Sequence, residues 1–294
     1  MIPDRNQKTG KSMKNHSQSR FMSRRECLAA VGAAGCLLQP GFSLANEQQS
    51  AAGGFESLFD GKTLDGWHTN PEKIGHGTGG RWTIDDGIIV GEQDPPGSGN
   101  GGLLLSDRKF ANFELTVEMR PDWGVDSGVF FRCTDRGAGF QMYVDYHDGG
   151  NVGHLRGEMP GSFAIKPFQI FGDVDEAGKL AGFSTDTDSR SRRWPEGVYE
   201  YACTPQQWLD TWKIGEWNTA KIRCIGKYPQ ITTWINGVKV CHFDGEDSTL
   251  PGYDKKRVFK QLGRSGSIGL QVHGGAAWAA GEKCRWKNIF LKEL

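Results

Sequence analysis

Apolar and polar residues alternate along several short segments of the chain, which predicts half-buried antiparallel strands. The clearest is the segment 113–120, whose odd-numbered positions are apolar and whose even-numbered positions, among them Glu114 and Glu118, are polar. The dipeptides Asp86-Gly87 and Asn236-Gly237 stand between short apolar-rich segments and predict tight hairpin turns. Further strands are expected at 128–133, 140–146, 218–225, 230–235, 238–243, 266–273 and 284–291.

Helical periodicity is nearly absent, and glycine makes up 42 of the 294 residues. Dense glycine without a collagen-type repeat is typical of an all-β protein with many tight turns. The strands follow one another at the spacing of a sandwich, so a single all-β domain is expected over residues 55–294. The polar segments 94–102 and 173–194 are expected to be long surface loops, and the first is long enough to indicate a function.

Residues 1–45 have the three parts of an export signal. Arg24 and Arg25 form a twin-arginine pair, an apolar Ala/Gly-rich stretch follows at 28–38, and Ser43-Leu44-Ala45 offers small residues for a signal peptidase. We therefore expect a twin-arginine-type signal peptide over residues 1–45, a polar linker over 46–54, and a periplasmic or secreted mature protein. A weak lipobox before Cys36 makes a lipoprotein the less favoured alternative.

The charge balance excludes some classes of partner. Lys plus Arg and Asp plus Glu number 35 each, but residues 1–45 hold seven basic and two acidic side chains, so the rest of the chain is mildly acidic. A mildly acidic body without a basic stripe argues against nucleic-acid binding. No later segment approaches the roughly 18 apolar residues of a membrane span, so no membrane insertion of the mature chain is expected.

Five of the seven cysteines lie after residue 45. None forms a C-x-x-C pair, which argues against zinc ribbons and thioredoxin-type chemistry. Cys224 and Cys241 flank the predicted hairpin and could pair, although buried free thiols are the simpler interpretation.

A series of short motifs between residues 55 and 294 resembles the 3-keto-disaccharide hydrolase domain family. The motifs are Phe55 to Trp67, Trp82 with Asp86-Gly87 and Gly91, Leu103 to Leu105, Phe113-Glu-Leu, Asp126-Ser-Gly-Val-Phe-Phe-Arg132, Trp217-Asn218, Trp234 to Gly237, Gly269 to His273, and Asn288 to Leu294. The resemblance implies a concanavalin A-like jelly-roll sandwich of two antiparallel sheets. It also implies a substrate that is a glycoside whose sugar carries a 3-ketone. Gln141 and Tyr143 stand where the family often has Glu and Gln, and Lys287 where it usually has Arg.

Strand alternation groups polar side chains that could bind a sugar. It places Arg132 with Phe130, groups Gln141 with Tyr143 and Asp145, and groups Gln271 with His273. Sugars need hydrogen-bonding groups and aromatic platforms. We therefore expect substrate contacts from Trp123, Arg132, Gln141, Gln271 and His273.

The segment 145–158 carries the densest candidate chemistry, on what the glycines predict to be a flexible loop. Its acids and imidazoles suit Zn²⁺, Mn²⁺ or Ca²⁺, although they match no specific metal motif and a solvated turn is an equal alternative. The candidate ligands of a divalent ion are Asp145, His147, Asp148 and His154.

A 3-ketone acidifies the proton at C2, so cleavage can begin with removal of that proton and expulsion of the C1 oxygen. This chemistry needs a base, an acid and an electrophile at the ketone. The candidate catalytic residues are Asp145, His147 and Glu158, with Arg132 or a metal ion as electrophile. The sequence therefore predicts a secreted enzyme that cleaves 3-keto-glycosides. The alternative is a non-catalytic, lectin-like glycan-binding protein, which the loss of a carboxylate at Gln141 favours.

Overall fold

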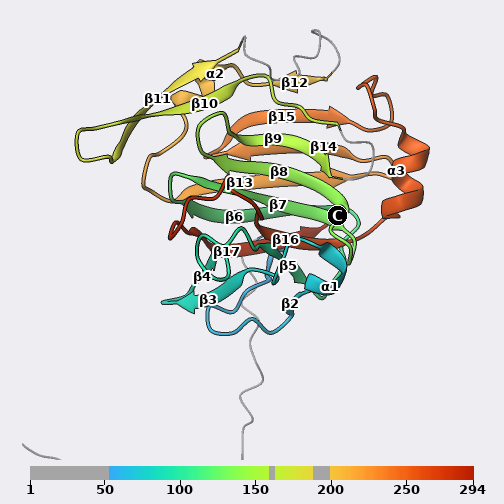
Figure 1. Cartoon of the computed structure of the whole chain (residues 1–294). Helices are drawn as coiled ribbons and strands as arrows, with labels where there is room; N and C mark the ends of the chain where they lie inside the picture. The colour runs from blue at the N-terminus through green and yellow to red at the C-terminus, as the bar shows by residue number, and fades with distance from the viewer. Residues whose placement is uncertain (1–52, 159–162, 188–198) are drawn as a thin grey trace, which may run out of the picture. The chain divides into compact units, whose positions relative to one another are not determined.

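The computed structural model describes residues 53–158, 163–187 and 199–294, all within the unit formed by residues 47–294 (Figure 1). The signal peptide expected over 1–45 and most of the expected linker lie outside the described residues. The described part is an all-β sandwich of two antiparallel sheets, as the strand pattern predicts. Among the described residues, no helix has the length and apolar character needed to cross a membrane.

The larger sheet has nine strands in the described part of the chain. Its order is β12 (Tyr201–Ala202), β15 (Val238–Asp244), β14 (Gln230–Ile235), β13 (Asn218–Ile225), β6 (Phe113–Pro121), β17 (Cys284–Glu293), β4 (Ile88–Glu92) and β3 (Arg81–Asp85), with β1 (Glu56–Ser57) also paired to β17. The two predicted hairpin turns join β3 to β4 and β14 to β15. In the second, Asn236 and Gly237 both have positive φ, which the tight turn requires.

The smaller sheet has six described strands and carries the candidate site. Its order is β2 (Trp67–Thr69), β5 (Gly102–Ser106), β16 (Ser267–Val272), β7 (Val125–Cys133), β8 (Gly139–Tyr146) and β9 (Asn151–Glu158). The segment expected to be a flexible loop at 145–158 is therefore largely β9. Because β9 pairs with β8, the alternation of a strand decides where its side chains point.

The core lies between the two sheets and is built from the alternate positions of facing strands. Phe113 of β6 packs edge-on against Phe131 of β7, with ring centroids 6.1 Å apart. The buried alternate residues of β6 contribute Leu115, Val117 and Met119, as the sequence pattern predicts. This shared apolar layer leaves each sheet with one outer face.

Three short helices and one separate hairpin complete the described fold. The helices are α1 (Pro71–Ile74), α2 (Pro205–Leu209) and α3 (Lys255–Leu262). The prediction of a loop at 173–194 is wrong for residues 173–186. There, β10 (Gln169–Val174) and β11 (Leu180–Asp186) form an antiparallel hairpin that projects from the sandwich (Figure 1). Asp175 and Gly178 close its turn, where Gly178 supplies a positive φ.

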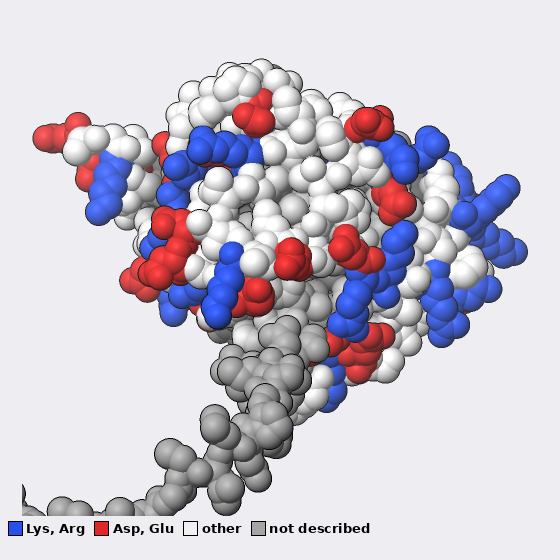
Figure 2. All heavy atoms as spheres, turned by 90° about the horizontal axis from the view of Figure 1, so that it is seen from below, with Lys and Arg blue, Asp and Glu red and all other residues white. Residues whose placement is uncertain are grey.

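Charged side chains of both signs are interspersed over the face seen in Figure 2. Lys and Arg gather most densely at the side on which α3 lies. That helix contains Lys255, Lys256, Arg257 and Lys260.

Candidate active site

Polar side chains cover the outer face of the six-stranded sheet. On β8, Phe140, Met142 and Val144 enter the core, so Gln141 and Asp145 point to the opposite face. The grouping of Gln141, Tyr143 and Asp145 predicted from alternation is confirmed. All three are nearly buried nonetheless, with Gln141 4% and Asp145 8% exposed. Loops and neighbouring side chains therefore enclose this face.

Two aspartates form the centre of the face. Asp126 on β7 is the register partner of Asp145 on β8, so the two carboxyl groups point the same way from adjacent strands. Burial and the nearby Asp126 carboxylate raise the pKa of Asp145 well above its usual range. Oδ1 of Asp145 is buried without a hydrogen-bond partner among the described residues. The pair therefore holds a proton at a pH where an isolated aspartate would have lost it.

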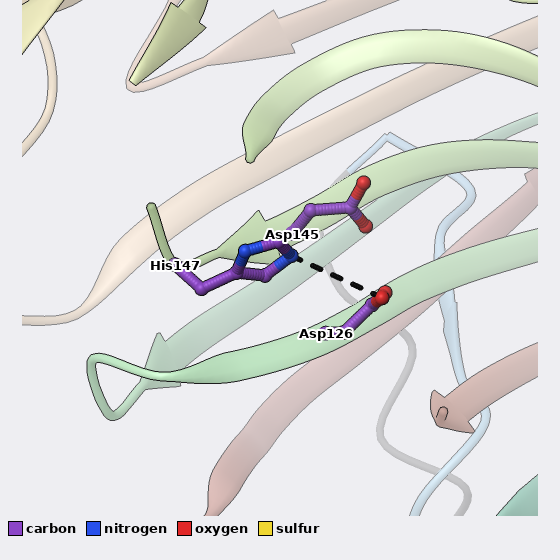
Figure 3. A group of neighbouring side chains, drawn as sticks. All are labelled: Asp126, Asp145 and His147. Atoms are coloured by element: carbon purple, nitrogen blue, oxygen red, sulfur yellow. Dashed lines mark ion pairs between the residues drawn. The ribbon is translucent and has the colours of Figure 1, made fainter. Parts of the chain in front are cut away.

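Imidazoles flank Asp126 on both sides. Nε2 of His147 lies 3.9 Å from Oδ2 of Asp126 (Figure 3). Nδ1 of His273 lies 3.7 Å from the same oxygen. Nδ1 of His147 lies 2.9 Å from the carbonyl oxygen of Asp148, which can only accept. Nδ1 of His147 therefore carries the proton, and in the neutral ring Nε2 offers its lone pair towards Asp126.

Two glutamines form the floor beside the carboxyl pair. Nε2 of Gln141 donates to Oε1 of Gln271 at 2.9 Å, across the width of β7. Gly128 makes this contact possible, because a Cβ there would lie 2.2 Å from Nε2 of Gln141. The structure thus brings together Gln141, Gln271 and His273, the three predicted contacts contributed by β8 and the β16 segment.

A second polar group lies along β9. Nε of Arg156 is paired with Oε2 of Glu158 and interacts with the hydroxyl of Tyr143. Although burial opposes the charge of Arg156, Tyr143 and Glu158 raise its pKa. Burial raises the pKa of Tyr143 to about 12. These groups present a fixed cation and a neutral phenol beside the glutamine floor.

Glu158 is on the predicted face but not beside Asp145. Asp145 pairs with Asn151, whereas Glu158 pairs with Gly139. Six positions separate these pairs along β8, or about 20 Å at the rise of a strand. Glu158 therefore lies at the far end of the face, and of the candidate bases Asp145 and Glu158 its position favours Asp145.

Lys166 follows β9 in the chain and lies near Tyr143 on the outer face. Its Nζ donates to the carbonyl oxygen of Gly149 at 2.7 Å and lies 5.9 Å from the centre of the Tyr143 ring. Burial lowers the pKa of Lys166, and the charges of Asp145 and Asp126 oppose that effect. Lys166 therefore lies close enough to the carboxyl pair to interact electrostatically with both aspartates.

The prediction that Arg132 faces the site is wrong. A β-bulge places two residues of β7, Phe131 and Arg132, against one residue of β16, and Arg132 takes a positive φ of 46°. The bulge turns Arg132 towards the interior, where it is 1% exposed. Its guanidinium donates to the carbonyl oxygens of Ala111 and Gly226, each at 2.7 Å. Arg132 thus links the segments that contain Ala111 and Gly226 by hydrogen bonds.

The predicted aromatic platform Trp123 is also placed elsewhere. Its ring packs edge-on against Tyr146, a core residue, at 5.0 Å between centroids, and lies tilted against Phe183 of β11 at 5.6 Å. A Cβ at Gly172 would lie 2.6 Å from the Trp123 ring. The ring therefore anchors the β10–β11 hairpin.

Two of the four predicted metal ligands point away from the others. Oδ1 of Asp148 accepts from the backbone N–H of Gly172 at 3.0 Å. His154 is fully buried on the core side of β9, where its Nδ1 donates to Oδ1 of Asn151 at 3.0 Å. Burial lowers the pKa of His154 to about 3, which keeps the ring neutral. His154 is placed on the core side because residues 151–158 form a bulged strand, whereas Asp148 lies in the turn before that strand, where the backbone of Gly172 engages its carboxylate.

Asp126, Asp145 and His147 bring one ligand atom each within 4.8 Å of one another. Two carboxylates and an imidazole suit a divalent ion, and the backbone carbonyl on Nδ1 of His147 fixes the tautomer that a metal ligand needs. The unpartnered Oδ1 of Asp145 adds a free donor atom. These residues therefore fit a metal ion. Of the predicted ligands, Asp145 and His147 belong to this group, and Asp126 joins them.

The five cysteines of the described part are free and buried. Cys224 on β13 and Cys241 on β15 are separated by the intervening strand β14, so the suggested pairing does not form. Burial raises the pKa of each thiol, which makes the thiols unreactive.

Sequence reasoning missed several residues of the face, namely His76, Asp126, Tyr143 as a site residue, Arg156 and Lys166. Asp126 could have been found, since a hairpin register between the strands at 128–133 and 140–146 sets it opposite Asp145. His76 and Lys166 lie outside the sheet, and no strand pattern indicates them.

Comparison with known proteins identifies the family of the chain. The model of the 3-keto-alpha-glucoside-1,2-lyase-like domain family matches residues 54–292. A 3-keto-disaccharide hydrolase of Bacteroides thetaiotaomicron is 33% identical over 263 residues, which cover 83% of this chain and 79% of that protein. A solved structure from Parabacteroides distasonis, assigned provisionally as a glycosyl hydrolase, is 19% identical with a TM-score of 0.47 and covers 86% of this chain and 98% of its own. The carbohydrate-binding module CBM66 of Bacillus subtilis is 12% identical with a TM-score of 0.39, covering 78% of this chain and 96% of its own. On the family match and the Bacteroides relative, the chain belongs to the 3-keto-alpha-glucoside-1,2-lyase-like family of carbohydrate-cleaving enzymes.

Proposed function

We propose that the protein cleaves the glycosidic bond of 3-keto-glycosides on the outer face of the six-stranded sheet. The observation that carries the proposal is the carboxyl pair of Asp126 and the buried Asp145, in which Asp126 lies between the imidazoles of His147 and His273. The family match and the name of the Bacteroides relative support the substrate class.

The spacing of the carboxyl groups favours proton removal over ordinary glycoside hydrolysis. Glycosidases place two carboxylates about 5–10 Å apart, on either side of the bond that they break. Here the oxygens of Asp126 and Asp145 lie within 4.8 Å and leave the same face of the sheet. The nearby Asp126 carboxylate disfavours ionisation of Asp145, and a carboxylate with a raised pKa is an effective base near neutral pH.

The reaction that fits this arrangement begins at C2. The Asp126–Asp145 pair takes the C2 proton, and the C–H electrons move into an enolate with the C3 ketone. The enolate then expels the C1 oxygen, which takes a proton from His273 as the alcohol leaves. Gln141, Gln271 and Arg156 can hold the sugar hydroxyls by hydrogen bonds. Water addition to the unsaturated product completes the net hydrolysis.

The cluster of Asp126, Asp145 and His147 would hold a divalent ion, as its donor set allows. Such an ion would polarise the ketone oxygen when bound. Binding is measured without activity by titrating Mn²⁺ or Zn²⁺ into the metal-free protein and following heat release and thermal unfolding. Asp126→Asn should abolish the response, whereas Asp148→Asn, altered just outside the cluster, should retain it.

Export by the twin-arginine route is part of the proposal. That route carries folded proteins, so thiols buried during folding reach an oxidising compartment already protected. The five free, buried cysteines of the described domain suit this order of events. Replacing Arg24 and Arg25 by lysine should retain the precursor in the cytoplasm, as immunoblots of cell fractions would reveal. Unchanged export would contradict this part.

The decisive experiment compares 3-keto-glucosides with the same glucosides before oxidation, with and without chelator, and measures release of the alcohol. We expect release from the keto substrates alone, and its loss with chelator would support metal assistance. Release from the unoxidised substrates would overturn the proposed chemistry. Tight glycan binding without release from either set would identify a glycan-binding protein instead.

A further inference from the structure

We propose that His76 is a further catalytic residue, which donates a hydrogen bond from a neutral imidazole to the ketone oxygen as the enolate forms. This inference rests on the proposed function, because it assigns one step of that reaction to a residue outside the sheet. His76 follows α1 in a loop that reaches the edge of the acidic face near His273.

Three glycine-rich segments hold His76 in place. The backbone N–H of Gly101 donates to the carbonyl oxygen of His76 at 2.7 Å, and the N–H of Gly79 donates to the carbonyl oxygen of Gly101 at 2.9 Å. Side chains cannot be added here, since a Cβ at Gly77 would lie 2.7 Å from the Asn100 side chain, and one at Gly274 would lie 3.0 Å from the His76 oxygen. The backbone that carries the imidazole is therefore fixed by close packing.

The His76 ring faces the active site. It packs edge-on against the His273 ring at 5.6 Å between centroids. The charges of Glu158 and Asp126 are near enough to oppose the lowering of its pKa. Nδ1 of His76 is buried without a hydrogen-bond partner among the described residues. Nδ1 of His273 also lacks a hydrogen bond there, although it lies 3.7 Å from Oδ2 of Asp126. A buried polar atom without a partner is costly and rare unless a ligand satisfies it. Two such atoms on adjacent rings indicate a place for a substrate oxygen.

Gln93 fixes the backbone at His273, the partner of His76 in the histidine pair. Its buried amide donates to the carbonyl oxygens of His273 and Gly275 and accepts from the backbone N–H of Gly99. The long polar loop expected to have a function at 94–102 is thus tied to the histidine pair. Its function in the structure is to position both rings relative to Asp126.

The neutral form of His76 suits hydrogen bonding to a ketone oxygen better than proton transfer to a leaving group. Burial and the neighbouring His273 lower the pKa of His76, so the ring is neutral near pH 7. A neutral imidazole N–H is a hydrogen-bond donor well matched to an enolate oxygen, whereas it is a weak proton donor to an alcohol. In the step, the base takes the proton from C2, the electron pair of that bond passes to the C3 oxygen, and His76 stabilises the charge without giving up its proton.

The test separates enolate formation from cleavage. A 3-keto C-glycoside cannot lose its C1 substituent, so exchange of deuterium at C2 for solvent hydrogen reports enolate formation alone. We expect His76→Ala to slow this exchange about a hundredfold, the usual effect of removing one such donor. Cleavage of 3-keto O-glycosides should fall equally for good and poor leaving groups. His76→Gln, which keeps an N–H donor, should recover part of both rates.

The matched control is His242→Gln. His242 lies on β15, where Thr232 Oγ1 is 2.7 Å from its Nδ1, on the opposite sheet. This variant should keep the wild-type rates, and thermal unfolding verifies that each variant folds. Exchange at the wild-type rate in His76→Ala, or a loss confined to poor leaving groups, would overturn the assignment to the ketone. Absence of both exchange and cleavage in the wild-type enzyme would overturn the proposed function itself.

Discussion

The two outer faces of the sandwich carry similar residue types and differ in how those residues are satisfied. On the six-stranded sheet, acids and imidazoles lie close together beneath surrounding loops. Asp145 is 8% exposed and has an unpartnered oxygen, and the nearby Nδ1 atoms of His76 and His273 also lack hydrogen bonds in the described structure. The electrostatic cost of this arrangement indicates a site that a ligand completes.

The outer face of the nine-stranded sheet satisfies its charges internally. Glu114 lies 3.2 Å from Nζ of Lys221, and Glu118 lies 3.5 Å from Nζ of Lys287. Lys287 and Arg120 also lie over the Trp217 ring, at 4.3 and 4.9 Å from its centroid. The expectation that Glu114 and Glu118 face away from the apolar stripe is confirmed. Alternating polar residues therefore mark an outer face, and only their pairing and burial separate a site from a solvated surface.

The largest expected difference between the faces is in catalysis. Asp126→Asn should lower kcat/KM for a 3-keto-glycoside by about a hundredfold or more, because it removes the carboxylate between two imidazoles. Glu118→Gln, a carboxylate of similar exposure on the other face, should leave the rate within about twofold. Both variants are measured in the same alcohol-release assay. An equal loss of kcat/KM in both would contradict the placement of the active site on the six-stranded sheet.

A smaller effect is expected for the arginine that the bulge turns inward. Arg132→Met should lower the free energy of unfolding by about 3 kcal/mol, because it leaves the carbonyl oxygens of Ala111 and Gly226 without donors. Arg120→Met, which removes a cation from the half-buried Trp217 ring, should cost about 0.5–1 kcal/mol. Urea unfolding measures both. A change of less than about 0.5 kcal/mol in the free energy of unfolding of Arg132→Met would contradict a stabilising role of Arg132 for these loops.

The smallest expected effect is a pH dependence of stability. The pKa of Asp145 is raised in the folded state, so the fold binds more protons than the unfolded chain above about pH 4, and stability falls as pH rises through the folded pKa. Asp145→Asn removes this loss. Its advantage over wild type in urea should therefore grow as the pH rises from 4 to 8. Glu114→Gln should show no such growth, and a constant difference for Asp145→Asn would contradict the raised pKa of Asp145.

The sequence predicted the sheet elements where one physical rule decides the outcome. The segments 218–225 and 230–235 match β13 and β14 in their bounds, because apolar alternation and a turn at Asn236-Gly237 leave one register that buries the apolar face. The same rule correctly grouped Gln141 with Asp145. It failed at Arg132, where one inserted residue reversed the alternation, and in the segment 145–158, where glycine and histidine concealed a strand.

What the sequence by itself determined was local: the strands, the hairpin turns, the family motifs and which residues of a strand share a face. Tertiary structure decided which distant groups meet. Asp126 acquires its function from the register between β7 and β8, and His76 from loops brought together by glycines far apart in the chain. Alternation is a property of one strand, whereas burial and charge coupling depend on the neighbours that the complete fold supplies.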